Sequence, residues 1–314
     1  MKTIDFNKSL MKTCLAVLIL AVIMLATNQP IQAQVQRDYI FIIDVTGSTW
    51  NWLSKWQASM PGWVAAQQAA LPGVRFGLVT HKDFPFSPYG GTGDYAYQMA
   101  AALNSNPANF LAAVAGLSSS GGGDGLESQY VTIFHTLSET GLDMNMDFDY
   151  VDQGEFPANQ IGILAGREIR MIILTDQKSF HDRDTDSNYP YAGASNVPGR
   201  TTCLTEVLTH PLTTYALYTG SWLKSDINPQ TGEPYSEDYY AADTTHLQEL
   251  CIKTNGHVIL MDTVASMDVA LDYIATNQPR RVPSLTGWGL AVLLVLLILS
   301  SIYVIARKRR LSVS

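Results

Sequence analysis

Several motifs that mark common enzyme classes are missing from this chain of 314 residues, and its six histidines are scattered. No serine lies in the G-x-S-x-G pattern of a nucleophile elbow, no H-E-x-x-H pair is present, and no P-loop lysine follows a glycine-rich loop. Thr46 stands where a phosphoryl-transfer enzyme with an Asp-x-Asp motif would carry its second aspartate. The sequence therefore offers no nucleophile and base pair that we can name.

Basic residues are scarce in the central part of the chain. Between residues 34 and 278 there are 27 acidic and 11 basic side chains, although the formal net charge of the whole chain is only −8. A surface with this excess of acid repels nucleic acids and anionic membranes and suits cations or basic partners. We therefore exclude nucleic-acid binding. Hydrophobic residues make up 46 % of the chain, which is enough for the core of one large α/β domain.

The N-terminal segment has the pattern of a secretory signal peptide. Three lysines precede an apolar run over residues 14–26, and Ala33 is a small residue before a plausible cleavage point. We expect residues 1–33 to be a signal peptide that is removed near Ala33. An uncleaved N-terminal anchor is the alternative.

The C-terminal segment contains a second apolar run, over residues 289–306, followed by a basic cluster in residues 307–314. The run is just long enough to span a bilayer, and the basic cluster is expected on the cytoplasmic side. Residues 34–278 would then face outward, as the signal peptide also requires.

A short motif in the linker over residues 279–288 and the start of the apolar run resembles a bacterial sorting signal. The pattern is Pro-Thr-Leu followed by Trp-Gly, which exosortase-type enzymes of Gram-negative bacteria process, and Val282 and Ser284 depart from it. The resemblance implies a processing enzyme as partner and a temporary span. An ordinary membrane anchor with Trp288 at the interface is the alternative. The motif residues are Val282, Pro283, Ser284, Leu285, Trp288 and Gly289.

Cysteine occurs only three times, and Cys14 lies in the expected signal peptide. The exported domain would therefore hold Cys203 and Cys251 alone, and two thiols in an oxidising compartment favour a disulfide. Two independent buried thiols are the alternative.

The most informative stretch is an apolar run over residues 39–43 that leads into Asp44, Thr46 and Ser48. The run predicts a strand buried on both faces, as in a parallel sheet. Alternating oxygen side chains on a tight loop at the end of such a strand can converge on one hard divalent cation. The alternative is that Ser48 only caps the next helix.

A second apolar strand, over residues 169–174, ends in Thr175 and Asp176. Between the two strands lies a glycine-rich loop that carries Asp124 and Glu127 before a helix. Since the carboxyl ends of parallel strands meet at one edge of a sheet, these three loops are expected to meet. The alternative is that Asp124 and Glu127 only interact favourably with the N-terminus of that helix.

The remaining pattern alternates strands and helices and predicts a Rossmann-like, doubly wound, mostly parallel six-stranded sheet with helices on both faces. The segment from Tyr95 to Leu103 is the expected antiparallel edge, and Pro61 is expected to kink or split the helix over residues 50–70. The acidic stretch over residues 141–160 is interpreted as a solvated insertion, since it lacks the glycine and distal glutamate of a calcium loop. Residues 177–199 form a connection long enough to be functional.

The pattern Asp44-x-Thr46-x-Ser48, with Asp176 after the later strand, resembles the metal-ion-dependent adhesion site of the von Willebrand factor A domain. The resemblance covers residues 38–273, nearly the whole of the exported domain. It implies that Glu127 completes a shell around Mg²⁺ or Mn²⁺. The implied ligands are Asp44, Thr46, Ser48, Glu127 and Asp176.

Within that family the integrin β-subunit version is most similar, because its loop after the second strand is matched by residues 83–89. Its second loop is echoed by Asp124 and Glu127, and its Thr-Asp-x-x-x-His pattern by residues 175–181, where the histidine falls one place further on. The resemblance implies an adjacent Ca²⁺ held by Asp83 and Asp124 with Glu127 shared.

The chain departs from the integrin pattern at two places. Gly122 stands where the second site expects an amide side chain, and residues 49–51 lack the acidic pair of the family's third, regulatory site. The resemblance still implies an exported, surface-anchored module that binds protein or another macromolecule when a ligand carboxylate completes the metal shell. A magnesium-dependent hydrolase on the same sheet and a scaffold with a purely structural ion are the alternatives.

Overall fold

The computed structural model describes residues 36–87, 89–123, 126–144, 146–150, 152–177, 180–184, 197–219, 245–261 and 266–276. The expected signal peptide, the sorting motif, the apolar run over residues 289–306 and the basic tail lie outside this part, as does Asp124. Within it, no helix has both the length and the apolar character needed to cross a membrane. The chain divides into two compact units, Met1–Ile274 and Ala275–Ser314, and the fold below is that of the first.

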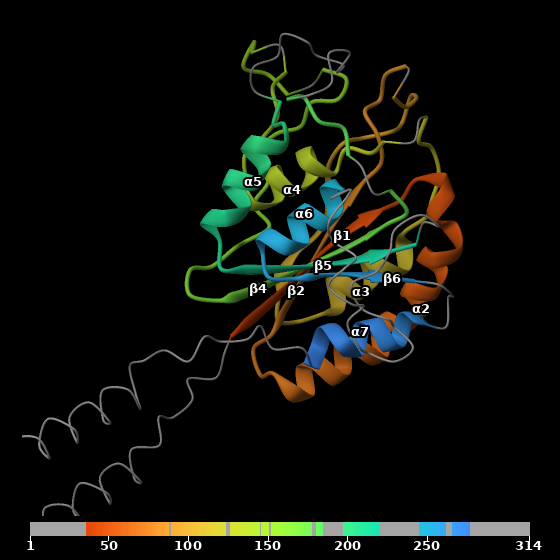
Figure 1. Ribbon diagram of the computed structural model, residues 1–314, viewed down its shortest axis with the longest axis vertical. Coiled ribbons are helices and arrows are strands. Elements are labelled where there is room, and N and C mark those ends of the chain that lie inside the picture. The colour runs from red at the N-terminus through yellow and green to blue at the C-terminus, as the bar shows by residue number, and fades with distance from the viewer. Residues whose placement is uncertain are drawn as a thin grey trace, which may run out of the picture. The chain divides into compact units, whose positions relative to one another are not determined.

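The described strands form one mixed sheet of six in the order β3-β2-β1-β4-β5-β6 (Figure 1). All neighbouring pairs are parallel except β2 and β3, so β3 is the antiparallel edge. The predicted six-stranded, mostly parallel sheet is thereby confirmed, although the edge strand begins three residues later than the expected Tyr95. The strands are β1 Arg37–Asp44, β2 Arg75–His81, β3 Gln98–Asn104, β4 Glu168–Thr175, β5 Leu212–Tyr218 and β6 His257–Leu260.

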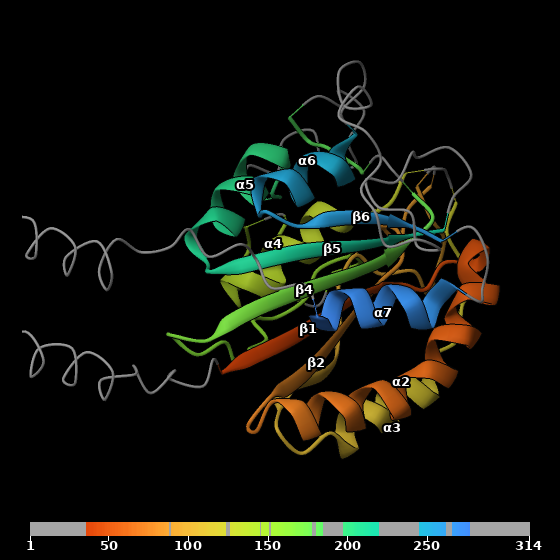
Figure 2. The ribbon, with the colours of Figure 1, turned by 60° about the horizontal axis from the view of Figure 1, so that its bottom comes forward.

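Helices cover both faces of the sheet, which confirms the doubly wound, Rossmann-like arrangement. Figure 2 shows α2, α3 and α7 on one face and α4, α5 and α6 on the other. Pro61 lies inside α2 without dividing it, so the expected split is wrong. The helices are α2 Trp50–Ala70, α3 Ala108–Gly116, α4 Gln129–Ser138, α5 Arg200–Thr209, α6 His246–Lys253 and α7 Ser266–Thr276, with a short 3₁₀ turn η1 at Gly47–Thr49.

The central strand β1 is buried along its whole length, as its unbroken apolar run predicts. On the face covered by α2 and α3, Phe41 packs against Trp56, Trp63 and Phe110 with ring centroids 5.3–5.7 Å apart. Full burial of each such side chain contributes about 1.5–3 kcal/mol. This aromatic layer fixes the strand whose last residue is Asp44.

Ion pairs around Asp38 hold the strands together at the end of the sheet opposite Asp44. Asp38 is fully buried in β1, and its Oδ1 accepts hydrogen bonds from Nε of Arg75 at 2.9 Å and from Nε of Arg167 at 2.6 Å. The carboxylate thus joins the starts of β1 and β2 to the segment before β4.

Three further expectations from the sequence concern the insertion, a long connection and the two cysteines. Residues 141–160 hold no helix or strand among their described positions, and Phe148 is 89 % exposed. Leu142 and Met144 are buried, so the insertion is solvated only in part. Of the connection over residues 177–199, the structure describes residues 177, 180–184 and 197–199. Cys203 in α5 and Cys251 in α6 are both buried. The disulfide between them stays a prediction.

Candidate metal centre

The first loop of the candidate site is a tight turn that holds the carboxylate of Asp44. The Oδ1 atom of Asp44 accepts hydrogen bonds from the backbone N–H of Thr46 at 2.9 Å and from the Thr46 hydroxyl at 2.6 Å. Ser48 lies inside η1, exposed to solvent, and its Oγ is 3.3 Å from Oγ1 of Thr46. The N-cap of α2 is Thr49, which makes no side-chain capping bond. The interpretation of Ser48 as a helix cap is therefore wrong.

The second strand end lies beside the first because β1 and β4 pair in parallel, with Ile43 opposite Leu174. Thr175, the last residue of β4, donates its hydroxyl to Oδ2 of Asp44 at 3.0 Å. Asp176 follows, half-buried, and accepts a hydrogen bond from the Ser48 hydroxyl. The ends of β1 and β4, which are far apart in sequence, thus bring the carboxylates of Asp44 and Asp176 together with the hydroxyls of Ser48 and Thr175.

The two carboxylates interact electrostatically. Burial raises the pKa of Asp44 above its ordinary value, and hydrogen bonds from Thr46 and Thr175 partly offset that effect. Burial also raises the pKa of Asp176, and the neighbouring charge of Asp44 raises it further. Two interacting acids that are both desolvated favour a cation between them, since its charge would offset both penalties.

The glycine-rich second loop packs directly on the first. Its Gly121 accepts a hydrogen bond at 3.1 Å from the backbone N–H of Gly47, and its Ser120 N–H donates at 2.9 Å to the carbonyl of Val45. Gly122 adopts a φ of +81°, and a Cβ there would lie 3.1 Å from Cγ2 of Thr46. Only glycine fits this left-handed backbone and close approach without strain.

Glu127 reaches the same group from the far side of that loop. Its side chain is buried, at 2 % exposure, and its Oε1 would be 3.9 Å from a Cβ at Gly122, the position that also touches Thr46. Its backbone is fixed by a hydrogen bond at 2.9 Å from the N–H of His181. Hydrogen bonds thus join Asp44, Thr46, Ser48 and Asp176 into one group, and the carboxylate of Glu127 lies next to Gly122, which borders Thr46. Their binding of a metal remains a prediction.

The sequence reasoning gave no positioning role to two residues, Thr175 and Gln129. Besides bonding Asp44, the Thr175 hydroxyl accepts hydrogen bonds from Nε2 of Gln129 at 3.1 Å and from the N–H of Gln177 at 3.0 Å. Thr175 was noted only as the hydroxyl beside the strand-end acid Asp176. Gln129 carries no such signal, because its role depends on how α4 packs against β4.

The predicted second, calcium-like site is less complete. Asp83 is fully buried, and its Oδ1 accepts a hydrogen bond from the N–H of Phe84 at 2.8 Å and lies 3.3 Å from Nε2 of His181. Asp124 lies outside the described residues. Two of the three predicted ligands are therefore described by the structure. Asp83 faces His181, and Glu127 lies beside the first loop.

An acidic cluster that the sequence reasoning set aside lies in the insertion. Asp143, Asp147 and Glu155 bring carboxylate oxygens within 4.8 Å of one another and could hold a cation. Both oxygens of Asp143 already accept backbone N–H groups, from Met146 and Phe148. These carboxylates are half-buried or exposed, so a cation there would offset a smaller desolvation penalty than a cation beside the buried Asp44.

No protein-family model matches the chain, and no curated protein sequence matches it either.

The chemistry of the main site follows from its own atoms. Its ligand atoms are all oxygens, from carboxylates and hydroxyls, which suits a hard cation such as Mg²⁺ or Mn²⁺. His81 ends β2 opposite Asp44 in the sheet register, but burial lowers the pKa of its imidazole to about 4. This imidazole is a weak base at neutral pH, which counts against a hydrolase built on it.

Proposed function

We propose that the protein is an exported, surface-anchored module of von Willebrand factor A type that binds a macromolecular ligand through a divalent cation. The observation that carries the proposal is the meeting of Asp44 and Asp176 with the hydroxyls of Thr46 and Ser48 at the carboxyl ends of β1 and β4. A structural ion would need no solvent-facing ligand, whereas Ser48 is exposed.

Each side chain would have its own role in such a site. Asp44 is held by three donor groups from both strand ends, so it is already oriented for a cation. Thr46 and Ser48 contribute neutral oxygens, which leave the positive charge only partly compensated. When bound, Mg²⁺ or Mn²⁺ would supply a coordination position that a ligand carboxylate fills, and that charged pair is strong because the edge is partly desolvated.

The expected location belongs to the same proposal. The signal peptide over residues 1–33 and the sorting motif before residue 289 support export in a Gram-negative bacterium and processing by an exosortase-type enzyme. Mass spectrometry of the mature C-terminus tests this part separately. Processed protein should end near Pro283, and finding residues 307–314 on all of the surface protein would leave a simple membrane anchor.

Calorimetric titration of the full chain with Mg²⁺ and Mn²⁺ tests the metal site. Asp44→Asn should abolish the high-affinity binding event, because the variant keeps the shape of the side chain and removes its charge. Asp147→Asn, which changes the acidic cluster of the insertion, is the matched control and should bind as the wild type does. The reverse result would move the metal centre to the insertion.

Further assays distinguish the two alternatives. A purely structural ion would raise the melting temperature of the protein while chelation left surface adhesion of the producing cells unchanged. A hydrolase would turn over ester or phosphate substrates in Mg²⁺ and lose turnover in Asp44→Asn.

A further inference from the structure

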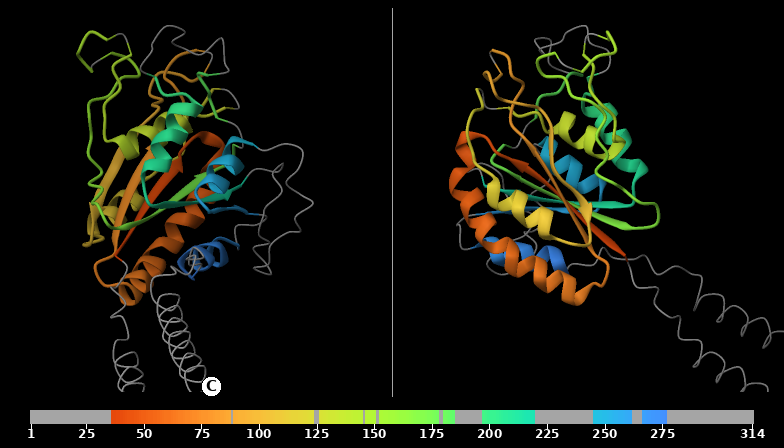
Figure 3. Two further views of the ribbon diagram at one scale, coloured as in Figure 1. Left: turned by 60° about the vertical axis from the view of Figure 1, so that its left-hand side comes forward. Right: turned by 180° about the vertical axis from the view of Figure 1, so that it is seen from behind.

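The insertion over residues 141–160 carries a tip, residues 146–150, in which apolar and acidic side chains alternate. The apolar side chains are Met146, Phe148 and Tyr150, and all three are exposed, Phe148 at 89 %. A single exposed apolar residue is ordinary on a protein surface, but three within five consecutive residues form a patch. Figure 3 shows the insertion reaching past the end of the sheet, at the same end of the molecule as the loop after β2.

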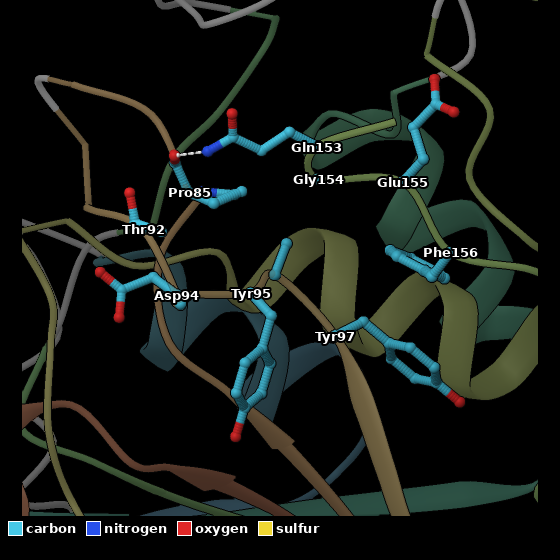
Figure 4. Close-up of a pocket in the computed structure, with 11 residues that line it drawn as sticks. Pro85, Thr92, Asp94, Tyr95, Tyr97, Gln153, Gly154, Glu155 and Phe156 are labelled. Carbon is cyan, nitrogen blue, oxygen red and sulfur yellow. Dashed lines mark hydrogen bonds between the residues drawn. The ribbon is translucent and has the colours of Figure 1, made fainter. Parts of the chain in front are cut away.

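The base of the insertion is fixed to the rest of the domain. Leu142 and Phe156 exchange backbone hydrogen bonds of 2.9 and 3.1 Å. Leu142 and Met144 are also buried in one apolar cluster with the loop after β2. On the returning side of the insertion, Nε2 of Gln153 donates a hydrogen bond to the carbonyl of Pro85 (Figure 4). The tip therefore projects from a base that is tied down on both sides.

The tip itself is held in one shape by Asp143. Oδ1 of Asp143 accepts a hydrogen bond from the N–H of Met146 at 2.6 Å, and Oδ2 accepts one from the N–H of Phe148 at 2.9 Å. Both residues have a left-handed backbone, with φ of +62° and +68°, which bulky side chains rarely adopt. The carboxylate thus stabilises an unfavourable backbone in which two large apolar side chains stay exposed. A tip that is ordered before binding loses less conformational entropy when a partner covers it.

The charge of the insertion is of one sign. Residues 141–160 contain no lysine, arginine or histidine and five acidic residues, Asp143, Asp147, Asp149, Asp152 and Glu155. Asp147 and Asp149 lie between the three apolar residues of the tip and are exposed as well. A partner that covers the apolar side chains therefore also meets this negative charge, which favours a basic surface around the contact.

We propose that the tip docks a protein whose surface has an apolar pocket surrounded by lysine and arginine side chains. Aromatic and methionine side chains are enriched at the centres of protein interfaces, and Phe148 is the main anchor here because it is the most exposed of the three. The acids around it speed association with a basic partner and fix its orientation. This surface goes beyond the proposed function, since it needs no cation at the sheet edge.

Two other occupants of the tip fit its charge less well. A second copy of the chain would bring the same acidic tip, on a central part with 27 acidic and 11 basic side chains. An anionic membrane would be repelled by the same acids. Charge therefore favours a basic protein over both of them.

Site-specific photo-cross-linking of the full chain in the cells that produce it tests the docking site. The probe is p-benzoylphenylalanine at position 148, where it replaces another aromatic residue, and mass spectrometry identifies the cross-linked peptides. The matched control carries the same probe at position 208, because Leu208 in α5 is 60 % exposed and lies outside the insertion. We expect one protein to be cross-linked from position 148 and not from position 208, through a peptide with lysine or arginine beside apolar residues. The same product should form in Asp44→Asn.

Affinity measurements with the cross-linked protein, purified without the probe, then separate the contributions to binding. Phe148→Ser should lose about tenfold or more in affinity, whereas Leu208→Ser should bind as the wild type does. Asp147→Asn combined with Asp149→Asn should slow association and make it less sensitive to salt concentration. Asp143→Ala keeps the apolar anchors but releases their backbone, so its affinity should also fall.

Other outcomes overturn the inference in distinguishable ways. No product from position 148, or the same products from positions 148 and 208, would show that the tip has no partner of its own. Cross-links to lipid or to a second copy of the chain would replace the protein partner with a membrane or a dimer contact. Unchanged affinity in Phe148→Ser would show that the cross-linked protein binds elsewhere. Loss of the product in Asp44→Asn would assign the partner to the candidate metal centre, whereas failure of the wild type to bind Mg²⁺ would contradict the proposed function alone.

Discussion

Thr175 at the end of β4 donates its hydroxyl to Oδ2 of Asp44 at the end of β1, over a distance of 3.0 Å. This bond joins the two strand ends that carry the candidate metal centre. Together with the hydrogen bonds from Thr46, it provides the fully buried carboxylate of Asp44 with donors for both of its oxygens.

Removing this hydroxyl should damage both stability and metal binding. Thr175→Val preserves the shape of the side chain but leaves Oδ2 of Asp44 and Nε2 of Gln129 without this partner. We expect a loss of about 1–3 kcal/mol in the free energy of unfolding, measured with urea, and weaker Mg²⁺ binding. Thr214→Val in β5 is the control, because the buried Thr214 hydroxyl has no hydrogen-bond partner among the described residues. Equal losses in the two variants would contradict this role of Thr175.

Asp176→Asn should have opposite effects with and without metal. Burial and the charge of Asp44 raise the pKa of Asp176, so its ionised form destabilises the metal-free protein. In a chelator the variant should therefore melt at a higher temperature than the wild type. In Mg²⁺ a hundredfold above its Kd the wild type should gain about 2.7 kcal/mol, and the variant should gain much less. A variant that melts lower in chelator and still responds to Mg²⁺ would show that Asp176 is not at the site.

Acid should destabilise the fold through a buried histidine. Burial lowers the pKa of His135 to about 4 from an ordinary value of 6.5, and its Nδ1 lies 2.9 Å from the carbonyl oxygen of Thr140. The unfolded chain therefore binds more protons between these two values. The stabilising contribution is complete above pH 6.5 and is lost as the pH falls toward 4, by at most about 1.4 kcal/mol per pH unit.

His135→Asn tests this assignment, because its side-chain N–H can still reach the carbonyl of Thr140 and the group no longer titrates. Urea unfolding at a series of pH values should give a shallower dependence for the variant than for the wild type. Parallel curves would mean that His135 is already solvated in the folded state.

The buried carboxylate at the opposite end of the sheet should matter for stability alone. Asp38→Asn removes the charge that pairs with Arg75 and Arg167, and we expect a cost of about 3–5 kcal/mol in the free energy of unfolding. Asp268→Asn removes a charge that is 60 % exposed and pairs with Lys55, so it should cost about 1 kcal/mol or less. Mg²⁺ affinity of the folded protein should be unchanged in both variants.

The sheet could be predicted from the sequence because the apolar runs that mark its strands are local patterns. The unbroken apolar run before Asp44 and the similar run before Asp176 each predict a buried parallel strand, and parallel strands bring those acids to one edge. The place of β3 was predicted only approximately, because the half-exposed residues around Tyr95 give a weak pattern.

What the sequence could not predict depends on packing between distant segments. Gln129 supports Thr175 only because α4 lies against β4. Glu155 joins Asp143 only because Leu142 pairs with Phe156 and closes the insertion. Lys82 and Asp94 hold the loop after β2 against the glycine-rich second loop, and neither residue is marked by a motif.

The most direct test of the metal centre is an anomalous difference map from crystals of the protein grown in Mn²⁺. We predict a peak at the edge of the sheet, within about 2–2.5 Å of oxygens of Asp44, Thr46 and Ser48. Glu127 and Asp176 should lie at or just beyond that shell. A map with no peak there, or with its only strong peak at Asp143, Asp147 and Glu155, would contradict the account.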